Sequence, residues 1–133
     1  MLMVAVSCGI VIFAHGSSVS SANQAVVAVA HAAEVAGKFD LVATAFLEAR
    51  PSLEEAISLL VARGASRILV IPYFLTLGIH LQRDLPAMVD TISKTNPNVE
   101  IHVAPPLDGH PALVQIVLDR AREAQESDLT ITH

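Results

Sequence analysis

Short apolar runs and amphipathic stretches alternate four times along this chain. The apolar runs cover residues 4–13, 41–47, 67–71 and 99–103, and each is followed by a segment whose apolar positions have helical spacing. Runs that are apolar at nearly every position are typical of strands buried on both faces, and therefore of a parallel sheet. Four strand-helix units in succession predict a three-layer α/β sandwich, with a four-stranded parallel sheet and helices on both faces. We expect the strand order 2-1-3-4.

Capping signals mark where the first two helices begin. Ser21 with Gln24, and Ser52 with Glu55, have the spacing of a capping box, in which each side chain bonds the backbone amide of the other residue. Both pairs stand directly before or within a stretch of helical periodicity. We therefore predict that the first helix starts near Ser21 and the second just after Ser52.

The chain closes with a fourth helix and a polar tail. The helix begins near Pro111, and we expect it to bury its apolar residues against the sheet; these are Leu113, Ile116, Val117 and Ala121. We predict one domain over residues 1–124 and a polar, frayed tail over residues 125–133.

Composition narrows the classes of function. The chain has 133 residues, of which 53% are hydrophobic, and a mean hydropathy of +0.55, which excludes intrinsic disorder. It has 8 Lys and Arg against 13 Asp and Glu, for a net charge of -5, so a nucleic acid partner is not expected. One cysteine, Cys8, lies in an apolar run and cannot build a disulfide framework, which points to the cytoplasm.

The apolar opening of the chain is interpreted as a buried strand. Residues 1–14 have no Lys or Arg before them and are fewer than the ~20 residues that a membrane-spanning helix needs. We expect neither a signal peptide nor a membrane partner.

Histidines gather where the predicted strands end. In a parallel sheet the loops that follow the strands lie at the carboxyl edge, where ligands bind, and His15, His80 and His110 fall on these loops. In the order 2-1-3-4 the topological switch point lies between the first and third strands, so His15 and His80 would face each other. Two neutral imidazoles can share a divalent ion and leave positions open for a substrate. Alternatively, His15 caps a turn and His80 caps a helix.

Glu48 and the first loop supply candidate acid-base and anion-binding groups. Glu48 follows apolar residues, where desolvation would make it a usable proton acceptor at neutral pH; the alternative is an ion pair with Arg50 or a helix cap. The amides of Gly16, Ser17 and Ser18 lead into a helix and could cradle a carboxylate or phosphate group.

Further residues at this edge could meet an anionic small molecule. Arg50 and Arg83 are the cations nearest the edge, with surface ion pairing as the alternative. Phe74 provides an apolar wall beside His80 together with neighbouring leucines, although such residues are more often core or interface. His110 could simply cap the last helix. We interpret the remaining histidines as structural or incidental; they are His31, His102 and His133.

Spaced motifs in the sequence resemble the short CbiX-type sirohydrochlorin chelatases, which are class II chelatases. The motifs are FAHGS at 13–17, AFLE at 45–48, PSL at 51–53, PYFL at 72–75, GIH at 78–80 and DLP at 84–86. The likeness covers residues 11–121. Residues 18–21 and Ile79 depart from the family's pattern, since a charged residue is usual in the first segment and a basic one at the second. Both changes lower the positive charge near a polycarboxylate substrate.

The resemblance implies an enzyme that inserts a divalent metal into sirohydrochlorin, usually cobalt on the way to cobalamin, and in related members iron for sirohaem or nickel. His15 and His80 match the two metal-binding histidines, and Glu48 matches an acidic residue of the site, so these three are the expected catalytic residues. The metal is then a substrate, and no tightly bound cofactor is expected. The long members have two lobes with a cleft between them, which implies a homodimer with the tetrapyrrole between two carboxyl edges. A noncatalytic carrier of the tetrapyrrole or metal is the alternative.

Overall fold

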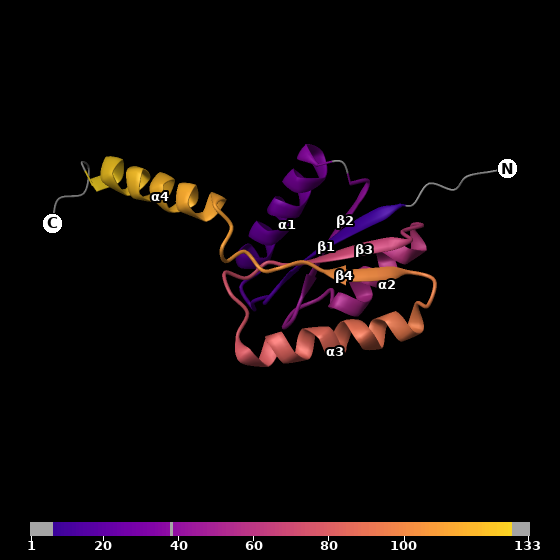
Figure 1. Cartoon of the computed structure of the whole chain (residues 1–133). Coiled ribbons are helices and arrows are strands. Elements are labelled where there is room, and N and C mark those ends of the chain that lie inside the picture. Colours follow the sequence, from indigo (N-terminus) through magenta and orange to yellow (C-terminus); the bar gives the residue numbers. More distant parts are fainter. Residues whose placement is uncertain (1–6, 38, 129–133) are drawn as a thin grey trace.

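The computed structural model describes residues 7–37 and 39–128 and forms the predicted α/β sandwich (Figure 1). The four strands are all parallel, in the predicted order β2-β1-β3-β4. The elements in chain order are β1 (Cys8–Ala14), α1 (Ser20–Ala36), β2 (Leu41–Phe46), α2 (Leu53–Ala62), β3 (Arg67–Pro72), α3 (Ile79–Thr95), β4 (Glu100–Val103) and α4 (Ala112–Asp128).

Helices α2 and α3 cover one face of the sheet and enclose the main core. Side chains that alternate along the strands point to this face, and the apolar stripes of both helices pack on them. The largest fully buried side chains of this layer are Val11, Phe13, Leu53, Ile57, Leu60, Ile68, Val70 and Leu85. Helix α1 lies on the other face, over β1 and β2 (Figure 1).

The strand register brings three strand ends to one edge of the sheet. Ala14, the last residue of β1, is in register with Phe46, the last residue of β2. Phe13 is in register with Pro72, the last residue of β3. The loops after β1, β2 and β3 therefore start side by side at the carboxyl edge.

One of the two predicted capping boxes is present. The Ser52 hydroxyl accepts a hydrogen bond from the amide of Glu55, and the Glu55 carboxylate accepts one from the amide of Ser52. The predicted start of the first helix near Ser21 is confirmed, because α1 begins at Ser20. The capping box predicted for Ser21 and Gln24 is wrong, because the N-cap is Val19, whose side chain makes no hydrogen bond. Asn23 holds this segment instead, from inside the helix.

Helix α4 differs most from the prediction. We predicted that Leu113, Ile116, Val117 and Ala121 are buried, and this is wrong: Leu113 is half-buried and the other three are exposed. The physical reason is visible in Figure 1, where α4 extends away from the sheet beyond the carboxyl edge and does not lie on either face. Among residues 112–127 none is buried.

The two ends of the chain bear on three further predictions. Helix α4 continues through Asp128, past residue 125, where the polar tail was expected to begin. Residues 4–6 of the first predicted strand and residues 129–133 of the tail lie outside the described residues. In the described part of the chain, no helix is both long enough and apolar enough to cross a bilayer.

Candidate functional site at the carboxyl edge

Backbone hydrogen bonds join the loops that follow β1 and β2. The amide of Leu47 donates to the carbonyl of Ala14 (2.9 Å), and the amide of Glu48 donates to the carbonyl of His15 (2.8 Å). Gly16 makes this approach possible: its φ of +87° favours glycine, and a Cβ atom there would lie 3.0 Å from the Cβ of Phe46. The two loops therefore hold His15 and Glu48 next to each other.

The ring of His15 is oriented by two acceptors on the same side. Its Nδ1 lies 3.2 Å from the carbonyl oxygen of Gly16 and 3.7 Å from Oε2 of Glu48. Two acceptors favour the tautomer with the proton on Nδ1, which leaves the Nε2 lone pair for a metal ion. Metal-binding histidines commonly have a carbonyl or carboxylate in this position. The turn-capping alternative for His15 accounts for Nδ1 and leaves Nε2 available.

Glu48 is more exposed than its sequence neighbours suggested. Its side chain is 64% exposed, so the desolvation expected from the apolar residues before it is absent. The reason is that β2 ends at Phe46, and Glu48 lies in the bend that follows. The carboxylate can therefore exchange protons with solvent directly, and its place in the site rests on its distance to His15.

His80 has a different neighbour from His15. It is the second residue of α3, whose N-cap is Gly78, so the helix-capping alternative is not observed. Nη2 of Arg83, one helical turn later, lies 3.4 Å from Nδ1 of His80. A guanidinium only donates, so Nδ1 is the acceptor in this contact and the proton of the neutral ring is on Nε2. A metal would have to replace Arg83 at Nδ1, or bind Nε2 after the ring has changed tautomer.

The two histidines follow adjacent strands, as the predicted topology requires. His15 comes directly after β1, and His80 comes after the loop that follows β3, the strand paired with β1. Within residues 7–37 and 39–128 no three His, Cys, Asp or Glu side chains gather closely enough to hold a metal ion. A metal at this edge therefore has few protein ligands, and a site shared by His15 and His80 stays a prediction.

Arg50 forms an ion pair with Glu55, the residue that completes the capping box of α2. Its guanidinium bonds both carboxylate oxygens of Glu55, with an Nε to Oε1 distance of 3.2 Å. This bond, followed by the bond from the amide of Ser52, lowers the pKa of Glu55 to about 2. Glu55 likewise raises the pKa of Arg50. The alternative in which Glu48 pairs with Arg50 is not observed, because Arg50 pairs with Glu55.

The remaining predicted binding residues differ in how available they are. The amide of Ser17 donates to Oδ1 of Asn23 (2.9 Å), and its hydroxyl accepts from the amide of Val19 (3.0 Å). Ser18 is exposed. Phe74 packs edge-on against Phe13, with 6.0 Å between ring centroids, so its ring faces the core.

Asn23 is a positioning residue that the sequence reasoning missed. Its side-chain amide accepts from the amide of Ser17 and donates to the Ser17 carbonyl (2.8 Å), which ties the loop after His15 to helix α1. An Asn within a predicted first helical turn, six residues after a small polar loop residue, was the available signal.

Comparison with known proteins agrees with this architecture. The family model CbiX matches residues 9–124. The chain belongs to the CbiX family. A curated relative from Methanopyrus kandleri, named sirohydrochlorin cobaltochelatase, is 29% identical over 86% of this chain and 95% of its own length.

Solved structures related to the CbiX family share the fold. A cobalamin biosynthesis CbiX protein from Marinobacter aquaeolei VT8 has a TM-score of 0.79 and 29% identity, and the match covers 90% of this chain and 98% of that one. The sirohydrochlorin chelatase SirB from Bacillus subtilis subspecies spizizenii, in complex with cobalt, has a TM-score of 0.82 over 89% of this chain. At 24% identity it shows the fold alone, and the match covers 51% of its length.

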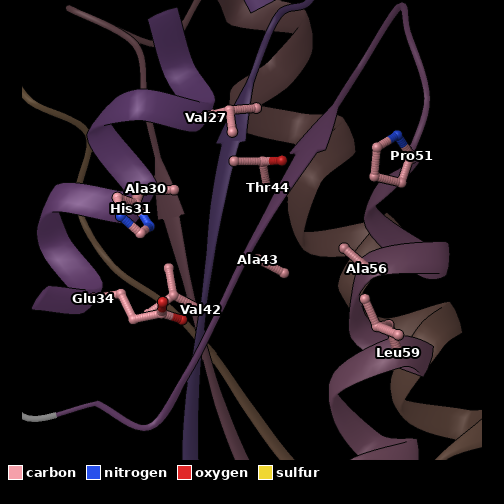
Figure 2. A pocket seen from close by; sticks show the side chains of 10 residues that line it. All are labelled: Val27, Ala30, His31, Glu34, Val42, Ala43, Thr44, Pro51, Ala56 and Leu59. Carbon is pink, nitrogen blue, oxygen red and sulfur yellow. The ribbon is translucent and has the colours of Figure 1, made fainter. Parts of the chain in front are cut away.

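The other described histidines of this CbiX-family chain are His31, His102 and His110. His110 caps α4, because its Nδ1 accepts from the amide of Ala112 (3.0 Å). His102 lies on β4, and its Nε2 is 3.8 Å from Oε2 of Glu100. Figure 2 shows His31 and Glu34 of α1 along a cavity at the edge strand β2, which residues of α2 also line.

Proposed function

We propose that this protein inserts a divalent metal ion, with Co²⁺ as the first candidate, into sirohydrochlorin. The observation that carries the proposal is the arrangement of His15: Glu48 and a backbone carbonyl face Nδ1, which leaves Nε2 for a metal at the edge where His80 also lies. Membership of the CbiX family and relatives named sirohydrochlorin cobaltochelatase support the choice of reaction.

In this proposal His15 and His80 hold the metal before transfer. Two imidazoles bind a divalent ion more weakly than a closed site with four ligands, so the macrocycle nitrogens can take the ion over. Iron and nickel would bind the same pair, because the general affinity order of divalent ions, and their availability, decides among them.

Glu48 is the proposed proton acceptor. A metal ion that enters the macrocycle displaces two pyrrole protons, and these need a proton acceptor within reach. The Glu48 carboxylate lies beside His15 and is mostly exposed, so it can accept a proton and pass it to water. It also faces Nδ1 of the His15 ring, which leaves Nε2 for the metal.

Cationic and polar groups at the edge are proposed to bind the substrate's carboxylates. Arg83 is exposed next to His80 and is therefore the first candidate. Ser17 and Ser18 lie in the loop after His15. Arg50 could bind a carboxylate only after its bond to Glu55 breaks. Phe74 could contribute only indirectly, because its ring packs against Phe13.

We further propose that the working unit is a homodimer in the cytoplasm, with the tetrapyrrole between two carboxyl edges. The chain spans about half the length of the SirB structure. Two copies would therefore supply the mass of that longer protein. A single free cysteine is compatible with a reducing compartment.

Anaerobic incubation with sirohydrochlorin and Co²⁺, Fe²⁺ or Ni²⁺ in parallel tests the activity. We expect the absorption spectrum of the macrocycle to change with many turnovers per protein. His80→Ala should abolish the change, and His31→Ala, which removes an exposed histidine from helix α1, should not. Activity that survives in His80→Ala would remove its ligand role. A signal that stops at one equivalent per chain would indicate a noncatalytic carrier.

A further inference from the structure

His80 shares the exposed first turns of α3 with the guanidinium that faces it. Nη2 of Arg83 lies 3.4 Å from Nδ1 of His80, and Nε of Arg83 lies 3.3 Å from Oδ1 of Asp84. The guanidinium therefore contacts a neutral ring nitrogen and a carboxylate of the same helix. A distance of 3.4 Å is at the long end of the hydrogen-bond range, and the Arg83 side chain is mostly exposed. The contact with His80 is therefore weak, and the side chain is free to change partner.

The backbone that carries this turn is fixed by two contacts. Nε2 of Gln82 donates to the carbonyl of Leu77 (2.9 Å), which ties the start of α3 to the loop after β3. Leu85, two residues after Arg83, is buried in the core. The helix therefore keeps His80 in place when the Arg83 side chain moves.

Exposed apolar side chains lie beside His80 in the sequence and on the neighbouring loop. Ile79, directly before His80, is 81% exposed, and Leu75, in the loop after β3, is 68% exposed. Leu47, in the loop after β2, is exposed as well. Such side chains favour contact with the flat apolar ring of a tetrapyrrole, which carries its carboxylates on the periphery. A ring placed over the metal ligands of the proposed function therefore brings carboxylates to the cation next to His80, which is Arg83.

We propose that Arg83 couples the binding of the tetrapyrrole to the binding of the metal ion. Before the tetrapyrrole binds, the guanidinium faces Nδ1 of His80 and its charge repels a divalent ion there. A carboxylate of the substrate draws the guanidinium away, because a charge-assisted hydrogen bond is stronger than a bond to a neutral ring nitrogen. The same carboxylate neutralises the charge that repelled the ion. The site therefore binds the metal more tightly once the macrocycle that receives it is in place.

This inference rests on the proposed function, in which His80 is a metal ligand, and adds an order of binding to it. Linkage requires that the metal raises the affinity for the tetrapyrrole by the same factor. Repulsion between a divalent ion and an exposed guanidinium a few ångströms away corresponds to a factor of about five in Kd. We therefore expect a coupling of at least about five-fold.

The first test measures the Kd for Co²⁺ with and without a macrocycle that cannot accept the ion. The probe is palladium uroporphyrin, an inert planar polycarboxylate whose centre is already occupied. At saturating probe the Kd of the native chain should fall by a factor about five times larger than the factor found for Arg83→Gln. Effects of the probe that do not pass through Arg83 occur in both proteins and cancel in this ratio.

Two matched variants show that the charge at this position carries the effect. Arg83→Lys keeps the positive charge and should retain part of the coupling. Arg122→Gln removes the same charge from α4, where Arg122 is paired with Asp119, and should behave as the native chain. Equal factors in the native chain and in Arg83→Gln would overturn the proposal.

The second test uses turnover with Co²⁺ and sirohydrochlorin. In the native chain the apparent KM for Co²⁺ should fall as sirohydrochlorin is raised from well below to well above its own KM, and in Arg83→Gln it should stay nearly constant. A merely structural role of Arg83 would change stability or kcat and leave this dependence intact. The same dependence in both proteins would overturn the coupling and leave the chelatase activity standing. A native chain that inserts no metal would refute the proposed function, and the coupling with it.

Discussion

Arg83 lies beside His80, and replacing Arg83 with glutamine tests whether its positive charge weakens the binding of a metal ion at this site. In the structure Nη2 of Arg83 is 3.4 Å from Nδ1 of His80, so a fixed positive charge faces one of the two ring nitrogens that a metal could use. Arg83→Gln removes this charge and keeps a polar side chain of similar reach. We expect the variant to bind Co²⁺ more tightly than the native protein in the absence of tetrapyrrole.

The size of the effect follows from the exposure and the distance. Two unit charges about 4 Å apart in water interact by about 1 kcal/mol. A divalent ion about 5 Å from the guanidinium is repelled by about 1.5 kcal/mol, and salt at about 0.1 M reduces this to about 1 kcal/mol. The Arg83 side chain is 72% exposed, so the value for water applies. A change of this size corresponds to a Kd for Co²⁺ that is about five-fold lower.

Competition with a chromophoric cobalt chelator measures this affinity directly. The control is Arg122→Gln, which removes the same charge from helix α4 and should leave the Kd unchanged. The gain should disappear at about 1 M salt, where charges are screened within about 3 Å. In turnover, the same variant should show a higher KM for sirohydrochlorin, because it has lost a cation that meets the carboxylates. Unchanged or weaker Co²⁺ binding in Arg83→Gln would refute the reasoning.

Three other predictions concern Gly16, Glu48 and Glu55. Gly16→Ala should lower the free energy of unfolding by about 1 to 2 kcal/mol in urea titrations, because the residue has φ +87° and its new Cβ would crowd Phe46. Gly64→Ala is the control: Gly64 has φ +99° with open space around it, so this variant should lose stability and keep metal insertion. Glu48→Gln should lower kcat strongly and change the Kd for Co²⁺ little, since it removes the proton acceptor. If kcat and the affinity for Co²⁺ fell by the same factor, Glu48 would be a metal ligand instead. The pKa of Glu55 is lowered from 4.5 to about 2 by Arg50 and Ser52, so its contribution to stability is complete above pH 4.5 and is lost as the pH falls towards 2. The midpoint of urea unfolding, measured from pH 2 to 6, should therefore depend less on pH in Glu55→Gln than in the native chain. The same pH dependence in both proteins would contradict the ion pair of Glu55 with Arg50.

The strand-helix order could be predicted because the signals are local. Continuous apolar runs and helical periodicity each depend on neighbours within one element, and the predicted order β2-β1-β3-β4 is the observed one. The capping box of Ser52 and Glu55 is equally local, since its partners are three residues apart. The same rule was wrong for the capping box at Ser21, because the N-cap of α1 is Val19. The bonds of Asn23 to the backbone of Ser17, six residues away, were not predicted.

The environment of the candidate site was set by contacts between distant segments. Glu48 follows apolar residues in sequence, yet its side chain is exposed because the chain turns outward after β2. Arg50 was a candidate partner of Glu48 and instead bonds Glu55. His15 acquires Glu48 as a neighbour only because the loops after β1 and β2 are joined by backbone bonds across the sheet.

The amino-acid sequence by itself determined the elements, their order along the chain, and the edge at which His15 and His80 would lie. It also determined that α4 is amphipathic, because a stripe is a property of one helix. Only the tertiary structure decided that this stripe is uncovered within its own chain and that Arg83 faces His80. The physical reason is that periodicity specifies which face of an element is apolar, whereas the surface that receives it depends on the three-dimensional path of the connecting loops.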